Sequence, residues 1–169
     1  FILATERLGE ERARILIRND VAVSDTKFVV DYFRMSPDYR LLFGGGENYT
    51  RRFPTDIKSF VRRYMLRVFP QLSEVCVDYA WGGTLAITRS RLPLFGRLEG
   101  DTYYALGYSG QGVALATLAG QVLSDAIAGT VEDFDVFARL PRRQFPGGSL
   151  LRWPSLAFGM MYYALRDQL

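Results

Sequence analysis

The stretch that most constrains this chain joins an apolar strand to a long helix of small residues through a glycine-rich turn. The run at 103–106 predicts the strand, and apolar residues that recur every three to four positions from Val113 to Ile127 predict the helix. Gly129 stands where a left-handed C-cap would end that helix. We therefore predict a strand–turn–helix unit over 102–128.

The start of the predicted helix suits an electron-rich group. The first backbone N–H groups of a helix have no intrahelical partner, and the helix dipole makes that end partly positive. Gly107, Gly110 and Gly112 leave room for a flat or anionic group to approach the backbone. A phosphate, a carboxylate or an electron-rich ring edge would fit, and tight packing as the only role of these glycines stays open.

Other motifs stand in an order that resembles a known family. These motifs are Ala4-Thr5-Glu6 with Leu8, Tyr32-Phe33-Arg34, Asp38 with the run Arg40 to Gly45, Trp81-Gly82-Gly83-Thr84, and Leu92-Pro93 with Gly96. With the turn and its helix, they resemble the C-terminal portion of the glycine/D-amino-acid oxidase (DAO) family of FAD-dependent oxidoreductases. The branch that the chain resembles most is the gamma-glutamylputrescine oxidase-like amine oxidases, and the likeness runs over residues 1 to 145.

The resemblance implies oxidation of a small-molecule amine, with hydride transfer from the carbon that bears nitrogen to a non-covalently bound FAD. It assigns no catalytic residue, and ordinary packing stays the alternative for Tyr108 and Trp81. The flavin-contacting residues it implies are Gly107, Tyr108, Ser109, Gly110, Gln111, Gly112 and Val113. The substrate pocket it implies contains Trp81, Gly82, Gly83 and Thr84.

Three departures from the family narrow the expected substrate. Leu85 stands where related amino-acid oxidases carry the arginine that pairs with the substrate carboxylate. Gly82 or Gly83 stands near the covalent-flavin cysteine of the sarcosine oxidases, and Ala114 stands where those enzymes have a lysine. A free amine, or an amine with a distant carboxylate, is therefore expected rather than a simple amino acid.

The resemblance also predicts how the chain is divided. Residues 1–101 are expected to form a substrate-domain-like part, 102–130 the closing segment of the FAD-binding domain, and 131–169 a tail. The Gly-x-Gly-x-x-Gly turn of the family's dinucleotide-binding half has no counterpart here, so we expect a fragment that is inactive alone. The alternative function is a non-catalytic α+β binding or assembly module derived from that scaffold.

Hydrophobic patterns along the chain predict an α+β fold with a mixed or antiparallel sheet. The expected elements are a strand at 1–5, a charged loop and a short strand over 9–17, a hairpin at 28–44, a helix at 56–69, an alternating strand at 75–79, a hairpin at 92–107 and a final helix at 155–166.

Composition excludes some function classes. With no histidine and one cysteine, Cys76, a transition-metal site is not expected. Lysine and arginine number 21 against 18 acidic residues, and they form no basic tract, which argues against nucleic acid. Cys76 lies in an alternating strand pattern and is expected to be buried. A single cysteine fits a reducing compartment, and we expect a cytoplasmic protein.

The final apolar segment is expected to dock on the rest of the protein. The alternative is a weak membrane or partner contact through the helix at 153–166, which is too short to span a bilayer. Strands whose partners lie outside the chain would also leave sheet edges exposed, so we expect self-association through such edges.

Overall fold

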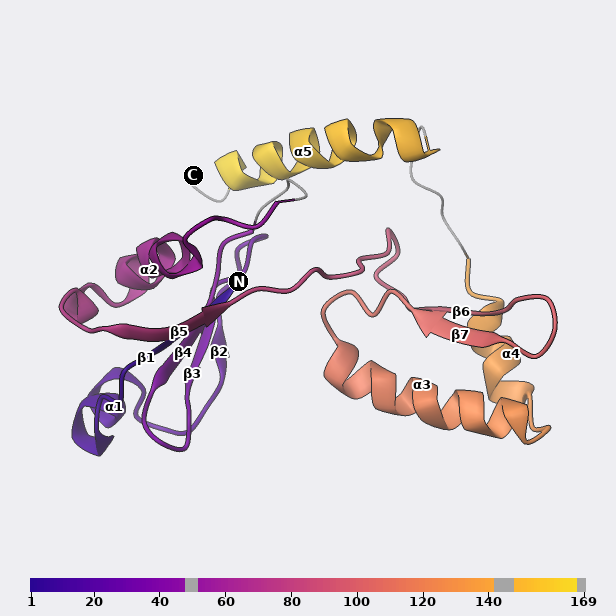
Figure 1. Cartoon of the computed structure of the whole chain (residues 1–169), viewed down its shortest axis with the longest axis horizontal. Coiled ribbons are helices and arrows are strands. Elements are labelled where there is room, and N and C mark those ends of the chain that lie inside the picture. Colours follow the sequence, from indigo (N-terminus) through magenta and orange to yellow (C-terminus); the bar gives the residue numbers. More distant parts are fainter. Residues whose placement is uncertain (48–51, 142–147, 167–169) are drawn as a thin grey trace. The chain divides into compact units, whose positions relative to one another are not determined.

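The computed structural model describes residues 1–47, 52–141 and 148–166. They form two compact units, each with its own hydrophobic core. Unit 1 comprises Phe1–Gly83 together with Trp153–Leu169, and unit 2 comprises Thr84–Arg152. Figure 1 labels the elements of both units. The expected division at 101 and 130 concerns the roles of the segments, and it stays a prediction.

Unit 1 is built on a five-stranded antiparallel sheet in the order β2-β3-β4-β1-β5 (Figure 1). Tyr32 lies opposite Gly44 in the β3–β4 hairpin, and Met35 lies opposite Leu41. The hairpin expected at 28–44 is confirmed for these two strands. The strands are β1 (Ile2–Thr5), β2 (Val23–Ser24), β3 (Tyr32–Met35), β4 (Leu41–Gly44) and β5 (Val77–Trp81).

Helix α2 (Ile57–Val68) packs against this sheet, as the pattern at 56–69 predicts. Asp56 caps it, because its carboxylate accepts a hydrogen bond of 3.0 Å from the backbone N–H of Ser59. The helix ends before Pro70, which begins a 3₁₀ turn at Pro70–Leu72. The core of the unit contains Leu3, Leu41, Phe43, Val61, Met65, Leu72 and Val75, all fully or almost fully buried.

Helix α1 (Glu10–Leu16) stands where a charged loop and a short strand were expected, so that expectation is wrong. Glu10 and Glu11 lie in its first turn, where the helix dipole favours negative charge. Arg14 forms an ion pair of 2.8 Å with Glu10 across one helical turn. These local charges, and burial of Ala13, favour a helix more than the short apolar run favours a strand.

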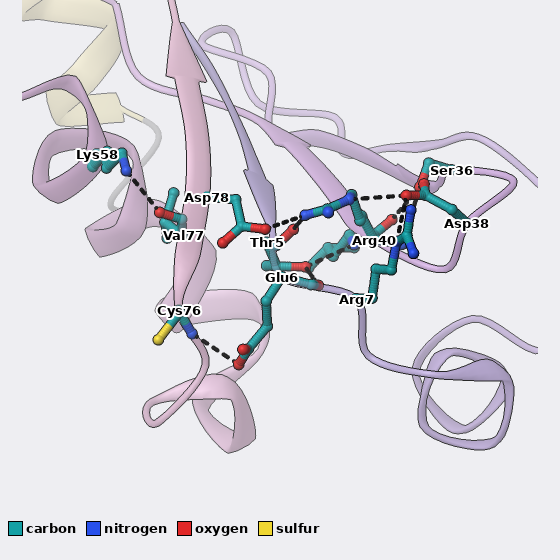
Figure 2. Close-up of polar contacts among 11 residues, drawn as sticks. Thr5, Glu6, Arg7, Ser36, Asp38, Arg40, Lys58, Cys76, Val77 and Asp78 are labelled. Atoms are coloured by element: carbon teal, nitrogen blue, oxygen red, sulfur yellow. Dashed lines mark hydrogen bonds and ion pairs between the residues drawn. The ribbon is translucent and has the colours of Figure 1, made fainter.

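Arg40 joins several segments at one end of the sheet (Figure 2). Its guanidinium donates to the carboxylate of Asp38 at 3.0 Å, to the carboxylate of Asp78, and to the carbonyl oxygen of Thr5 at 2.7 Å. The hydroxyl of Thr5 accepts a hydrogen bond of 2.9 Å from the buried backbone N–H of Leu41. Strands β1, β4 and β5 and the β3–β4 turn are thus held together by one polar cluster.

Asp38 is the most strongly perturbed acid of this cluster. Its carboxylate accepts hydrogen bonds from Ser36 at 2.7 Å and from the guanidinium groups of Arg40 and Arg7. These contacts, that from Ser36 most of all, lower the pKa of Asp38 from 3.8 to about 2. The carboxylate therefore stays ionised in the folded protein well into the acid range.

Two side chains of α2 occupy backbone acceptors of β5 and of the segment before it. Lys58 donates to the carbonyl of Val77 at 2.9 Å, and Arg62 donates to the carbonyls of Val75, at 2.9 Å, and Ser73. Because β5 is an edge strand, these contacts satisfy groups that could otherwise pair with another chain.

Cys76 lies in this same segment and is exposed. The expectation that it would be buried is therefore wrong. The alternation at 75–79 places Val75 rather than Cys76 in the core, and the strand itself begins at Val77.

Unit 2 packs two helices against a hairpin of β6 (Leu94–Arg97) and β7 (Tyr103–Leu106). The helices are α3 (Gly112–Ile127) and α4 (Glu132–Ala138). Gly129 has a φ of 101° and follows α3, and Thr130 N–H donates to Asp125 O at 2.9 Å, as in a glycine C-cap. The predicted strand–turn–helix is confirmed. The core contains Phe95, Ala119, Val122, Ala126 and Phe134.

Helix α5 (Gly148–Arg166) is longer than the final helix expected at 155–166, and Pro154 lies inside it. Within unit 1, the ring of Tyr163 stacks on Phe28 with 3.9 Å between ring centroids, and Met160 is buried. Its C-terminal part therefore docks on unit 1, as expected. The helix keeps a row of exposed apolar side chains: Leu151, Phe158, Met161, Tyr162 and Leu165.

The α+β class with antiparallel sheets is confirmed. Over the described ranges, no helix has both the length and the apolar character that crossing a bilayer requires. Among the same residues, no cluster of three or more histidine, cysteine or acidic side chains is placed to hold a metal ion.

Candidate functional site

The glycine-rich turn between β7 and α3 has a backbone that few other residues could adopt. Gly107 and Gly110 have φ angles of 75° and 93°, and Ser109 between them has 53°. A Cβ on Gly107 would lie 2.5 Å from the methyl carbon of Thr88, so a side chain there would displace its neighbour. The glycine at this position is thus required by both conformation and space.

Hydrogen bonds fix the turn against the segment at 86–88. The backbone N–H of Ser109 donates to Ala86 O at 3.1 Å, and the Ser109 hydroxyl donates to Gly107 O at 3.2 Å. That hydroxyl also accepts from the Thr88 N–H at 3.2 Å. The phenol of Tyr108 donates to Ala105 O at 3.2 Å, which anchors the ring beside the strand. The turn is therefore held rigidly before the helix begins.

The N-terminus of α3 is open. Gln111 occupies the N-cap position, and its side chain makes no capping hydrogen bond. Val113 is 97% exposed, and Gly112 has no side chain to cover the first N–H groups. An electron-rich group placed here would accept hydrogen bonds from backbone donors and be stabilised by the helix dipole.

A second candidate region is a hollow on the face of the unit 1 sheet, with a volume of about 220 Å³. Its lining is almost entirely apolar, with Arg34 as the single charged member. The lining residues are Ile2, Ala22, Val23, Tyr32, Phe33, Arg34, Leu42, Gly44 and Trp81. Such a surface can bury the hydrocarbon part of a small molecule. Its one charged side chain is already paired, since Arg34 donates to Asp20 Oδ1 at 3.3 Å and to Met35 O at 3.2 Å.

The hollow depends on the pairing of Tyr32 with Gly44. The tyrosine ring lies so close to the glycine that a Cβ on Gly44 would be 2.1 Å from the ring carbon Cζ. Partial burial, with a smaller contribution from the charge of Glu47, raises the pKa of Tyr32 above its ordinary value of 10.0. Trp81, opposite Ile2 on β1, lines the same hollow and is 45% exposed.

The predicted pocket residues have different environments. Trp81 ends β5 and lines the hollow, and Gly82 lies against Phe1, whose ring would be 2.4 Å from a Cβ there. Among the described residues, no atom lies within 4 Å of a Cβ placed on Gly83. Gly83 ends the first segment of unit 1, whereas Thr84 begins unit 2. The roles of these four residues, and of the seven in the turn at 107–113, stay predictions.

The sequence patterns do not indicate that Tyr32, Gly44 and Ile2 line one hollow. Tyr32 and Gly44 belong to motifs noted above, and they lie opposite each other because the hairpin is centred on Asp38. The turn signal at Ser36-Pro37-Asp38 indicates the hairpin, but a turn centred on Pro37 would have placed Tyr32 opposite Leu42, so the register was not readable from it. The approach of Trp81 and Ile2 could not be read in this way, because β1 and β5 are far apart in sequence.

Comparison with known proteins places the chain in a family. The model of the DAO family, described as FAD dependent oxidoreductase, matches residues 1–126. The chain therefore belongs to this family of FAD-dependent oxidoreductases, as the motifs predict. The match includes both candidate regions, the hollow and the turn at the start of α3.

Two individual relatives are named as oxidoreductases, in agreement with the family match. The chain is 46% identical over 168 residues to gamma-glutamylputrescine oxidoreductase of Escherichia coli, an alignment that covers 99% of this chain and 39% of that protein. It is 39% identical to the probable oxidoreductase OrdL of Haemophilus influenzae, with coverage of 99% and 38%. The chain thus spans about two fifths of the length of these curated relatives.

A solved structure shares the fold. The L-proline dehydrogenase from P. horikoshii superposes with a TM-score of 0.57 at 21% sequence identity, and the match covers 83% of this chain and 36% of that one. The described part of this chain therefore shares its fold with the matching part of that dehydrogenase.

Proposed function

We propose that this chain is part of a longer FAD-dependent enzyme that oxidises the C–N bond of an amine. In this proposal unit 2 contributes backbone donors to the flavin site, and unit 1 contributes an apolar wall to the substrate site. Family membership supports the cofactor and the class of reaction. The open N-terminus of α3 carries the proposal, because an exposed helix start with no capping side chain is suited to a group that gains negative charge.

The proposed role of the turn at 107–113 is to orient the flavin and stabilise its charge. Bound FAD would supply the acceptor for the hydride that leaves the substrate. The chain itself would supply the N–H groups at Gly112 and Val113, held in place by the hydrogen bonds of Ser109. Because these donors are backbone groups on a rigid turn, they need no rearrangement when charge develops.

The proposed substrate is an amine whose carboxylate is distant from the reacting nitrogen, such as a gamma-glutamylated diamine. The apolar hollow beside Tyr32 and Trp81 fits a methylene chain better than an α-carboxylate. Leu85, which replaces the carboxylate-binding arginine of related oxidases, is consistent with this choice. The name of the Escherichia coli relative points to the same substrate class.

Anaerobic reduction of the flavin in the full-length protein tests this function. We expect gamma-glutamylputrescine to bleach the flavin absorbance rapidly, and glycine, D-alanine and sarcosine to do so at least about 100-fold more slowly, because a misfitting substrate loses orientation. Rapid reduction by glycine or D-alanine would refute the substrate class. A full-length protein that binds no FAD would instead favour the non-catalytic assembly module.

The exposed apolar row of α5 supports a further part of this proposal, a weak contact with a membrane surface or a partner. We also propose self-association through an open sheet edge and a cytoplasmic location. Sedimentation velocity, liposome flotation and cell fractionation of the full-length protein test these three points separately. A monodisperse monomer that leaves liposomes unbound would contradict the first two.

A further inference from the structure

Asp31 is a buried acid that neither candidate region uses directly. It precedes β3, and its side chain is 3% exposed. One carboxylate oxygen, Oδ2, lies 2.9 Å from the ammonium of Lys27. The other, Oδ1, is buried and has no hydrogen-bond partner among the described residues. An unpaired buried acceptor is costly, so the position of this oxygen calls for an explanation.

The sheet register explains where that oxygen lies. Tyr32 is opposite Gly44, so Asp31 and Gly45 are the next residues along the two chains. Successive residues of extended chains project to opposite faces of a sheet. The ring of Tyr32 covers Gly44 in the hollow, whereas a Cβ on Gly45 would lie 2.5 Å from Asp31 Oδ1 on the side of Phe43 and Tyr64. The glycine pair is thus covered from both faces.

The carboxylate of Asp31 is held by its own loop. Its backbone N–H donates to Asp25 Oδ1 at 3.1 Å, and its carbonyl accepts from the Asp25 N–H at 3.0 Å. Lys27 bridges both acids, with 3.0 Å to Asp25 and 2.9 Å to Asp31. Three interactions therefore fix the residue immediately before Tyr32, two through its backbone and one through Oδ2.

We propose that Asp31 is a positioning residue for the substrate hollow. Its carboxylate packs against the backbone at Gly45 and fixes the start of β3. The position of the Tyr32 ring over Gly44 depends on this contact. The inference rests on the proposed function, because it takes the hollow as the substrate site. Asp31 does not touch substrate in this account, since Oδ1 lies on the core side of the sheet.

The variant Asp31→Asn in the full-length flavoprotein tests the role with almost no change in shape. It weakens the ion pair with Lys27 and places an amide against Gly45, so we expect KM for the amine to rise about 10-fold while kcat changes little. Asp101→Asn is the matched control, because Asp101 is exposed in the β6–β7 turn and pairs with nearby Arg97. An Asp31→Asn enzyme with wild-type KM would overturn the proposal.

Two further measurements separate positioning from general stability. Gly45→Ala should raise KM in the same way, because its Cβ would lie 2.5 Å from Asp31 Oδ1; the Cβ would also lie 3.0 Å from the ring of Phe43, so the stability of this variant is measured beside its KM. Hydrogen exchange, which needs no turnover, should be faster in Asp31→Asn at the amides of Tyr32 and Gly45 and unchanged in β5. Uniformly faster exchange throughout unit 1 would overturn the positioning role. If the wild type oxidises no amine, the proposed function fails, and hydrogen exchange alone then decides the role of Asp31.

Discussion

The two ends of the unit 1 sheet differ in polarity: one carries a cluster of polar side chains, and the other carries an apolar hollow. At one end, Thr5, Arg40 and Asp78 satisfy one another's polar groups and join three strands (Figure 2). At the other end, Ile2 and Gly44 lie in a hollow with an aromatic wall and almost no polar atoms. Strand β1 runs through both ends within four residues. The difference indicates that one end is built for stability and the other for access.

The two ends of the sheet are expected to respond differently to substitution. Substitutions at the polar end should change the free energy of unfolding and leave the affinity for substrate unchanged. Substitutions at the hollow should do the reverse, because an open, partly exposed surface contributes little to folding. Substitutions at one end that change both the free energy of unfolding and the affinity for substrate would contradict this assignment of stability to one end and access to the other.

The largest effect is expected from Thr5→Val at the polar end. The substitution keeps the shape of the side chain and removes the acceptor of the buried Leu41 N–H. We expect a loss of about 1–3 kcal/mol in the free energy of unfolding, measured by urea denaturation, because a buried donor is left unpaired. The exposed Thr102→Val is the control and should stay close to the wild type.

At the hollow, Gly44→Ala should act mainly on substrate. Its Cβ would collide with the ring of Tyr32, which can turn away because it is the end of a long side chain. We expect kcat/KM for the amine to fall about 10-fold, because a displaced wall misplaces the substrate. The melting temperature should barely change. A large loss of stability with unchanged kcat/KM would reverse the roles of the two ends.

A smaller effect is expected from pH at the polar end. The pKa of Asp38 is lowered in the folded state, so its contribution to stability is complete above the unfolded value near 3.8 and is lost as pH falls toward about 2. Asp38→Asn should flatten the dependence of stability on pH between these values. Urea melts at stepped pH measure it, and a variant that keeps the wild-type slope would exclude Asp38 as the source.

The smallest expected effect is a change in self-association through the β5 edge of the sheet. Lys58→Ala combined with Arg62→Ala would free the carbonyls of Val77, Val75 and Ser73. We expect a modest increase in the associated fraction by sedimentation velocity and no change in substrate affinity. Arg63→Ala, which removes an exposed arginine that stacks on Phe60, serves as the control. Equal association of both variants would mean that Lys58 and Arg62 do not protect this edge.

Much of this fold could be predicted from local sequence patterns. The helix at 56–69 followed from apolar spacing, and the strand–turn–helix followed from the run between Gly107 and Gly129, because these signals act within a few residues. The hollow could not be predicted fully, since the placement of Trp81 beside Ile2 arises from a pairing of distant strands. Helix α1 was missed because short charged segments depend on ion pairs that hydrophobic periodicity does not report.

The pairing of Tyr32 with Gly44 has one more consequence. The two positions share a single volume above the sheet, so room for a bulkier amine can be gained only by shrinking the aromatic partner, since the glycine is already minimal. If the hollow is the substrate site, as proposed above, changing Tyr32 to leucine or alanine is the direct route to a broader substrate range in an engineered enzyme. In natural relatives the same constraint would make the two positions vary together.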